Sequence, residues 1–189
     1  MSVIIAIKDK NKIYMGCDSQ ATAGQIKSTL RTEHGKVFEV KNCPFSLMGV
    51  AGSCRDAQLL SVNDELIDRM AVLTDNVDYE YMVKYFYNTI YTILLNNNRI
   101  ERDQNGNFVN FIGDDFIFAY KDKAYYVAGV DGSVEEIEDY LVIGSGANIA
   151  MGVLENNKKK KPKERIIEAI VACNDKTIYV DDNIVIRTT

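Results

Sequence analysis

The sequence predicts a single α+β domain, residues 1–189, in which strands and helices pack as the layers of a sandwich. The first observation is length, because 189 residues suit one domain with one substantial core. The second is composition: 47% hydrophobic and 26% charged residues are ordinary for a globular protein. The third is the order of the periodic segments, which runs strands, two helices, strands, two helices, strands. This grouping favours an α+β sandwich over an alternating parallel fold.

Two hairpins are predicted at the start of the chain. Val3–Ile7 and Ile13–Cys17 are short, β-branched runs separated by a polar turn. Val37–Val40 and Phe45–Val50 form the second pair, with Pro44 at the break between them. We expect the strands of each pair to lie side by side.

A first helix is predicted from Gly52-Ser53 to about Met70. Its apolar residues recur at helical spacing, at Ala57, Leu60, Leu66, Ile67 and Met70.

A second helix is predicted from Tyr79 to Leu95, and most of its surface is apolar. Its expected core face consists of Met82, Tyr85, Phe86, Ile90, Ile93 and Leu94. Val83, Tyr87, Tyr91 and Leu95 extend the apolar surface beyond that face. A helix of this kind is buried on more than one side. The second side is covered either by another subunit or by the Asn96–Asn107 loop of the same chain.

The second half repeats the grouping of strands followed by helices. The expected strands are Phe116–Tyr120, Lys123–Val127 and Tyr140–Ile143, with a closing hairpin of Thr177–Val180 and Asn183–Arg187. One helix follows Gly144-Ser145-Gly146 to about Leu154, and another spans Lys163–Cys173.

Charge and cysteine content exclude several function classes. The net charge of −5 argues against a general nucleic-acid binder, which is usually basic. No apolar run approaches the ~20 residues that a membrane helix needs. The four cysteines lack a CxxC pair and there is a single histidine, so no metal site and no cofactor is expected. Scattered thiols without a secretion signal are typical of a reducing, cytoplasmic compartment.

The second residue offers a nucleophile that needs no histidine. Removal of Met1 would leave Ser2 with a free α-amine, whose ordinary pKa is ~7.7–8.0. That amine can act as general base for the Ser2 hydroxyl, so one residue supplies both groups. The alternative is that Ser2 is an incidental second residue.

Five segments, in their order and spacing, resemble the proteasome β-type N-terminal nucleophile (Ntn) hydrolases, and the bacterial HslV peptidases in particular. The resemblance spans nearly the whole chain and rests on Ser2–Ile5, Gly16–Thr22, Lys36-Val37, Gly49–Ala57 and Ile143–Ala147. It implies a four-layer αββα sandwich. The family's nucleophile is usually threonine, so the serine here implies slower turnover or a different specificity.

The resemblance also implies roles for individual residues. Ser2 would be the nucleophile, with Lys36 as a cation beside it and Asp18 holding that lysine in place. The Gly52 N–H would stabilise the oxyanion, and Ser145 would bond the N-terminal amine. From the residues alone, Lys36 can equally be a strand-edge lysine, Asp18 a turn cap and Gly52 a tight-turn glycine.

By the same resemblance, Ala21, His34, Phe38, Val50 and Cys54 would line the primary substrate pocket. The implied function is hydrolysis of peptides or unfolded proteins in a self-compartmentalised homo-oligomeric ring, fed by a partner ATPase that unfolds substrates. Two other readings stay open: a catalytically inactive, ring-forming scaffold, and an amidase acting on small molecules.

Overall fold

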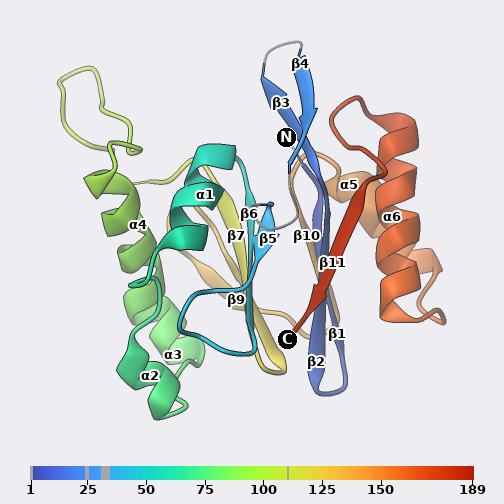
Figure 1. Cartoon of the computed structure of the whole chain (residues 1–189), viewed down its shortest axis with the longest axis horizontal. Helices are drawn as coiled ribbons and strands as arrows, with labels where there is room; N and C mark the ends of the chain where they lie inside the picture. Colours follow the sequence, from blue (N-terminus) through green and yellow to red (C-terminus); the bar gives the residue numbers. More distant parts are fainter. Residues whose placement is uncertain (1, 24–25, 31–34, 110) are drawn as a thin grey trace.

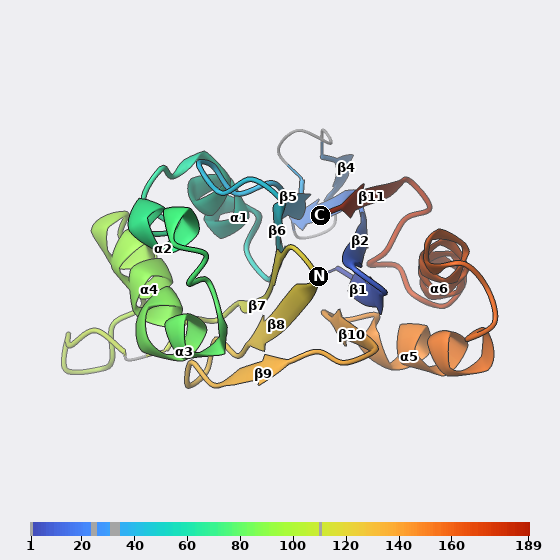
Figure 2. The ribbon, with the colours of Figure 1, turned by 90° about the horizontal axis from the view of Figure 1, so that it is seen from below.

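Four layers make up the protein in the computed structural model, which describes residues 2–23, 26–30, 35–109 and 111–189. Two β-sheets face each other in the middle, and each is covered on its outer face by helices (Figures 1 and 2). This arrangement confirms the predicted αββα sandwich. In the described part of the chain, no helix is both long and apolar enough to cross a membrane.

The two central sheets are antiparallel throughout. The first has the order β10-β1-β2-β11, made of Tyr140–Ile143, Ile4–Asp9, Lys12–Asp18 and Ile184–Thr188. The second has the order β5-β6-β7-β8-β9, made of Val37–Phe38, Ser46–Ala51, Asp115–Tyr120, Lys123–Val127 and Val134–Glu136. A separate hairpin, β3 and β4, consists of Gln20–Ala23 and Ile26–Thr29.

Helices form the two outer layers. One layer packs on the second sheet and contains α1, α2, α3, a π-helical turn and α4, which span Cys54–Val62, Arg69–Leu73, Tyr79–Tyr81, Met82–Phe86 and Tyr87–Asn96. The other packs on the first sheet and contains α5 and α6, at Ala147–Asn156 and Pro162–Lys176.

Strand β1 shows why the first sheet lies in the interior. Ile4 and Ala6 pack between the sheets, in one cluster with Ile117 and Ala119 of β7. Ile5, on the other face of β1, packs in a cluster with residues of α5 and α6. Successive strand residues point to opposite faces, so an unbroken apolar run is expected of a strand that is covered on both sides.

The first predicted helix is shorter than expected. It ends at Val62 rather than near Met70, because Asn63 takes up an extended conformation and its side chain accepts the Glu65 N–H at 2.8 Å. Such a local side-chain bond competes with the helix. Leu66 and Ile67 are still buried, but Met70 is 61% exposed.

The second predicted helix is continuous from Tyr79 to Asn96 and contains the π-helical turn. Its predicted core residues are buried except Tyr85, which is 57% exposed, so that assignment was wrong. Tyr87 and Tyr91 are half-buried against the same chain, where their hydroxyls donate to the carbonyls of Gly129 and Val109. These tyrosines therefore do not need a second subunit to cover them.

Three short strands escaped prediction, and one predicted strand is absent. The strands β3, β4 and β9 carry little apolar periodicity. The predicted strand Thr177–Val180 is not formed, and β11 pairs with β2 instead. The Gln20 side chain donates to the Ile178 carbonyl, so this segment is tied to β3 as a loop.

Candidate active site

Ser2 lies just before strand β1, where the loop Gly144–Gly146 surrounds its backbone. Ser2 is 2% exposed, and its carbonyl accepts hydrogen bonds of 3.3 Å from the Gly146 N–H and the Ser145 hydroxyl. A Cβ on Gly144 would lie 2.3 Å from the Ser2 carbonyl oxygen, and Gly144 has a φ of +95°. Only glycine suits both conditions. The loop Gly144–Gly146 therefore holds the N-terminal strand, and the Ser145 hydroxyl donates to the Ser2 carbonyl.

Asp18 and Lys36 form a buried ion pair beside this strand. The Lys36 Nζ lies 2.7 Å from Asp18 Oδ2, and the two side chains are 4% and 0% exposed. Asp18 also accepts the Val3 N–H at 3.0 Å and the Gln20 N–H at 3.2 Å. The carboxylate thus joins the backbone next to Ser2 to the lysine ammonium, and its contact with Lys36 is the one that the family resemblance implies.

The Gly52–Ser53 turn follows β6 and starts α1. The Ser53 hydroxyl caps this helix by accepting the Asp56 N–H at 3.4 Å. The Ser53 N–H donates to Asp114 Oδ1 at 2.9 Å. A Cβ on Gly52 would lie 1.8 Å from that same oxygen, so the Asp114 carboxylate occupies the space where any other side chain would be.

Asp114 contacts the Gly52–Ser53 turn and was not among the residues that the sequence singled out. It is 5% exposed, and its pKa is raised to about 7, chiefly by burial and also by the charge of Asp56. The Ser53 N–H and Arg99 act in the opposite direction. Nothing in the local sequence connects Asp114 with Gly52, because 62 positions separate them and only the pairing of β6 with β7 brings them together.

One cavity of about 330 Å³ brings three of the predicted catalytic residues together. Ser2, Lys36 and Gly52 all line it. Asp18 is not a lining residue but contacts Lys36, and Ser145 is not among the lining residues. A hydroxyl can act as a nucleophile, an ammonium can stabilise its negative charge, and a backbone N–H at a helix start can bind an oxyanion. These are functions that acyl transfer uses.

The residues expected in the substrate pocket do not all line this cavity. Val50 and Cys54 line the cavity, whereas Ala21 does not, and Phe38 is 3% exposed within the core that faces α1 to α4. His34 lies outside the described residues. The cavity has five further lining residues that were not predicted: Thr22, Leu30, Ser53, Arg55 and Ala57. Thr22 and Leu30 were missed because the hairpin β3–β4 was not predicted, whereas Arg55 and Ala57 follow directly from the predicted helix start.

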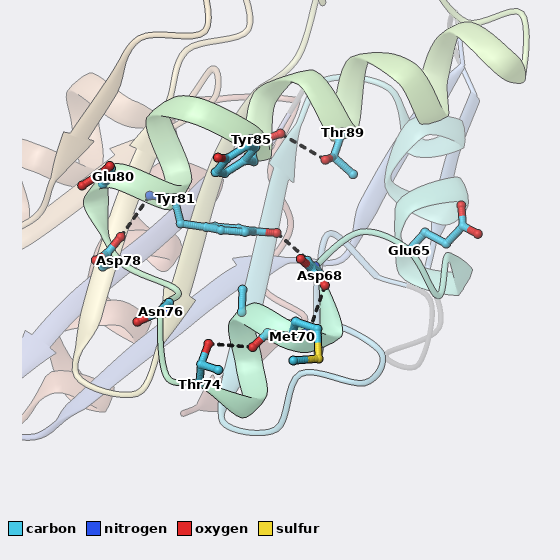
Figure 3. Close-up of a pocket in the computed structure, with 11 residues that line it drawn as sticks. Glu65, Asp68, Met70, Thr74, Asn76, Asp78, Glu80, Tyr81, Tyr85 and Thr89 are labelled. Carbon is cyan, nitrogen blue, oxygen red and sulfur yellow. Dashed lines mark hydrogen bonds between the residues drawn. The ribbon is translucent and has the colours of Figure 1, made fainter.

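A larger cavity of about 670 Å³ lies over α2, α3 and α4 (Figure 3). It shares no lining residue with the Ser2 cavity. Its polar groups serve the local fold: Tyr81 Oη accepts the Asp68 N–H at 3.0 Å, and Asp78 caps its helix through the Tyr81 N–H. Glu80 is paired with Lys84. We therefore assign no chemistry to this cavity.

In the described part of the chain, no group of three or more His, Cys, Asp or Glu side chains is placed to hold a metal ion.

Comparison with known proteins identifies a matching family and solved structures of similar fold. Residues 2–187 match the family described as proteasome subunit. Two solved structures of similar fold are BPH from Thiobacillus denitrificans (TM-score 0.72, 15% identity, 99% of this chain and 97% of that one) and eukaryotic HslV from Trypanosoma brucei (TM-score 0.61, 16% identity, 98% of each chain). BPH in complex with epoxomicin is also similar (TM-score 0.67, 14% identity, 99% and 97%). Both the match of residues 2–187 and the four-layer fold lead to one conclusion: the chain belongs to the proteasome subunit family.

Proposed function

We propose that this protein is a peptidase that uses Ser2 as an N-terminal nucleophile after removal of Met1. One observation carries the proposal: Ser2, Lys36 and Gly52 line a single cavity, and Asp18 links the lysine to the backbone beside Ser2. Membership of the proteasome subunit family supports the same chemistry.

The mechanism assigns one task to each group. The Ser2 amine takes the hydroxyl proton as Oγ attacks the substrate carbonyl, and Lys36 stabilises the negative charge on Oγ. The Gly52 N–H donates to the oxyanion. The amine then gives its proton to the leaving nitrogen, which produces an acyl-enzyme. Water, activated by the same amine, releases the second product and restores Ser2.

The proposed substrates are peptides or unfolded proteins with an apolar residue before the cleaved bond. Val50, Cys54 and Ala57 provide apolar lining in the cavity. We expect leucine, phenylalanine or tyrosine to be preferred, by an energy of ~1–3 kcal/mol per apolar group gained. A cleavage profile from a peptide library dominated by acidic or basic residues would contradict this assignment.

We further propose that the chain assembles into a homo-oligomeric ring fed by an ATPase unfoldase. Proteasome and HslV subunits generally form rings, which supports the first part. Val83 and Tyr85 are 49% and 57% exposed, so the helical layer offers apolar side chains for contact. Sedimentation velocity tests the assembly: a ~21 kDa monomer at micromolar concentration would contradict it, and Tyr85→Glu should weaken it.

The central experiment measures N-terminal processing and activity together. Intact mass of natively expressed protein should show loss of one methionine. Epoxomicin, which is bound in one of the similar BPH structures, serves as the covalent probe. Ser2→Ala should abolish both labelling and peptide hydrolysis, whereas Ser2→Thr should retain them.

The alternatives give different results in the same experiment. An inactive scaffold would retain Met1 and resist labelling. A small-molecule amidase would lose Met1 and hydrolyse small amides but not peptides. Full activity of Ser2→Ala would overturn the proposed nucleophile.

A further inference from the structure

A second, smaller cavity lies on the other side of Ser53 from the Ser2 cavity. It measures about 200 Å³, and its lining includes Ser53, Asp56, Arg99 and Asp114. Gly52 lines only the Ser2 cavity, whereas Ser53 lines both. Ser53 therefore lies between the proposed active site and a cavity that is lined by the buried carboxylates of Asp56 and Asp114.

The charges around this second cavity do not balance. Asp56 and Asp114 are each 5% exposed, and the cation Arg99 forms an ion pair with Asp56 and acts on Asp114 through its charge. Arg99 bonds the Asp56 carboxylate and the Ser53 hydroxyl. Asp114 Oδ2 is buried and has no hydrogen-bond partner among the described residues. A buried polar atom without a partner is costly, and two buried carboxylates with one cation favour retention of a proton.

We propose that Asp114 is a positioning residue for the oxyanion-binding turn, which holds Gly52 in place while one proton is shared between Asp114 and Asp56. Its Oδ1 accepts the Ser53 N–H and fills the space at the Gly52 Cα, so it supports the turn by hydrogen bonding and by contact. The protonated Asp114 carboxyl group shares that proton with the Asp56 carboxylate, whose side chain interacts with it. Loss of the proton leaves two repelling carboxylates behind the turn. This inference rests on the proposed peptidase function for its catalytic consequence.

The charged groups around Asp114 determine the direction in which its pKa is shifted, and therefore how the turn responds to pH. Asp56 on α1 raises its pKa, while Arg99, after α4, and the Ser53 N–H lower it. Glu101 is the other ionisable residue that lines the cavity. The pKa of Asp114 is about 7, so the turn is held below neutral pH and loosened above it.

The kinetic test compares two variants of Asp114 with a control at the next position. Asp114→Asn keeps an acceptor for Ser53 and a donor for Asp56 but cannot ionise, whereas Asp114→Ala removes both. Asp115→Asn is the control, because Asp115 bonds Gly129 and Tyr126 and not the turn. Peptide kcat and KM are measured from pH 5.5 to 8.5.

The expected result is a loss in kcat with little change in KM. Asp114→Ala should lower kcat about ten- to hundredfold, the range for a displaced catalytic group. The ratio of kcat for Asp114→Asn to kcat for wild type should rise with pH, while the same ratio for Asp115→Asn stays flat. A wild-type pH profile in Asp114→Asn, or a wild-type kcat in Asp114→Ala, would overturn the proposal.

A second measurement separates this inference from the proposed peptidase function. Amide hydrogen exchange at Gly52 and Ser53, corrected for the intrinsic rate, should accelerate across neutral pH in wild type and not in Asp114→Asn. If wild type hydrolyses no peptide but shows this acceleration, the peptidase assignment fails and the Asp114 assignment stands. If protection of the two amides is the same in both proteins at every pH, the Asp114 assignment fails whatever the activity.

Discussion

Two buried groups of charges flank the Ser2 cavity, and they differ in balance. Asp18 and Lys36 form a one-to-one pair, in which the carboxylate also accepts two backbone N–H groups. On the other side, Arg99 pairs with Asp56 and acts on Asp114 through its charge, and one oxygen of Asp114 has no partner within the described residues. We therefore expect the Asp18–Lys36 side to keep one geometry and the Asp56–Asp114 side to respond to pH near neutrality.

The largest expected effect comes from breaking the balanced pair. Lys36→Ala leaves Asp18 as an unpaired buried charge, so the free energy of unfolding should fall by about 3–5 kcal/mol. Peptide hydrolysis should fall by orders of magnitude, since the ammonium beside Ser2 is lost. Urea denaturation and peptide kinetics measure the two effects.

Lys41→Ala is the matched control for this variant. Lys41 pairs with Asp64 at 3.3 Å, but both side chains are exposed, at 47% and 68%. Its loss should cost less than about 1 kcal/mol. Equal destabilisation by the two lysine variants would show that the Asp18–Lys36 pair has no special role in stability.

The next effect tests the contact between the unbalanced group and the turn. Gly52→Ala puts a Cβ 1.8 Å from Asp114 Oδ1, so we expect a loss of about 1–3 kcal/mol from overpacking. The same change in an Asp114→Ala background should cost less, because the obstructing carboxylate is gone. A double-mutant cycle in urea measures this coupling.

Gly152→Ala is the control for the glycine substitution. Gly152 lies in α5, and nothing lies within 4 Å of the position that its Cβ would take. This variant should be neutral or slightly stabilising, because alanine favours a helix. Purely additive costs of Gly52→Ala and Asp114→Ala would mean that the two residues do not support each other.

The last expected effect is a pH dependence of stability. An unfolded aspartate titrates near pH 3.9, whereas folded Asp114 titrates at about 7. Between these values the folded state holds a proton that the unfolded state has released, so the free energy of unfolding falls as pH rises. Asp114→Asn removes this component.

Thermal unfolding from pH 4 to pH 8 provides the measurement. The Tm of wild type relative to Asp114→Asn should fall by at least about 2 °C across that range, which corresponds to ~1 kcal/mol. Asp115→Asn should stay parallel to wild type. A constant difference between wild type and Asp114→Asn would contradict the raised pKa.

The sequence predicted the Asp18–Lys36 side of the site but not the side that contains Asp56, Arg99 and Asp114. Ser2, Asp18, Lys36 and Gly52 were predicted through their resemblance to a family pattern, and the structure brings them together. Asp114 follows an irregular loop and carries no motif. Its role depends on packing between segments far apart in the chain, which no local pattern encodes.

Local patterns also predicted most regular elements, for a physical reason. The strands β1, β2, β7, β8 and β10 and the helices α4, α5 and α6 have clear apolar patterns, either continuous runs or periodic spacing, because each packs at least one face against a core. The end of α1 after Val62 depends on a single side-chain hydrogen bond, and the hairpin β3–β4, which was not predicted, contains exposed residues. Such features contribute little to an apolar pattern.

By itself, the sequence predicted the layered α+β architecture, and its resemblance to a known family singled out Ser2, Asp18 and Lys36. The apolar spacing of strands and helices specifies which faces must be buried, and burial is the dominant favourable term in folding. Only the tertiary structure decided that Tyr87 and Tyr91 are covered within the chain and that Phe38 belongs to the core. It alone placed the Asp114 carboxylate behind Gly52. Those outcomes depend on which distant segments of the chain pack together, and on the charge and volume of the side chains at each contact.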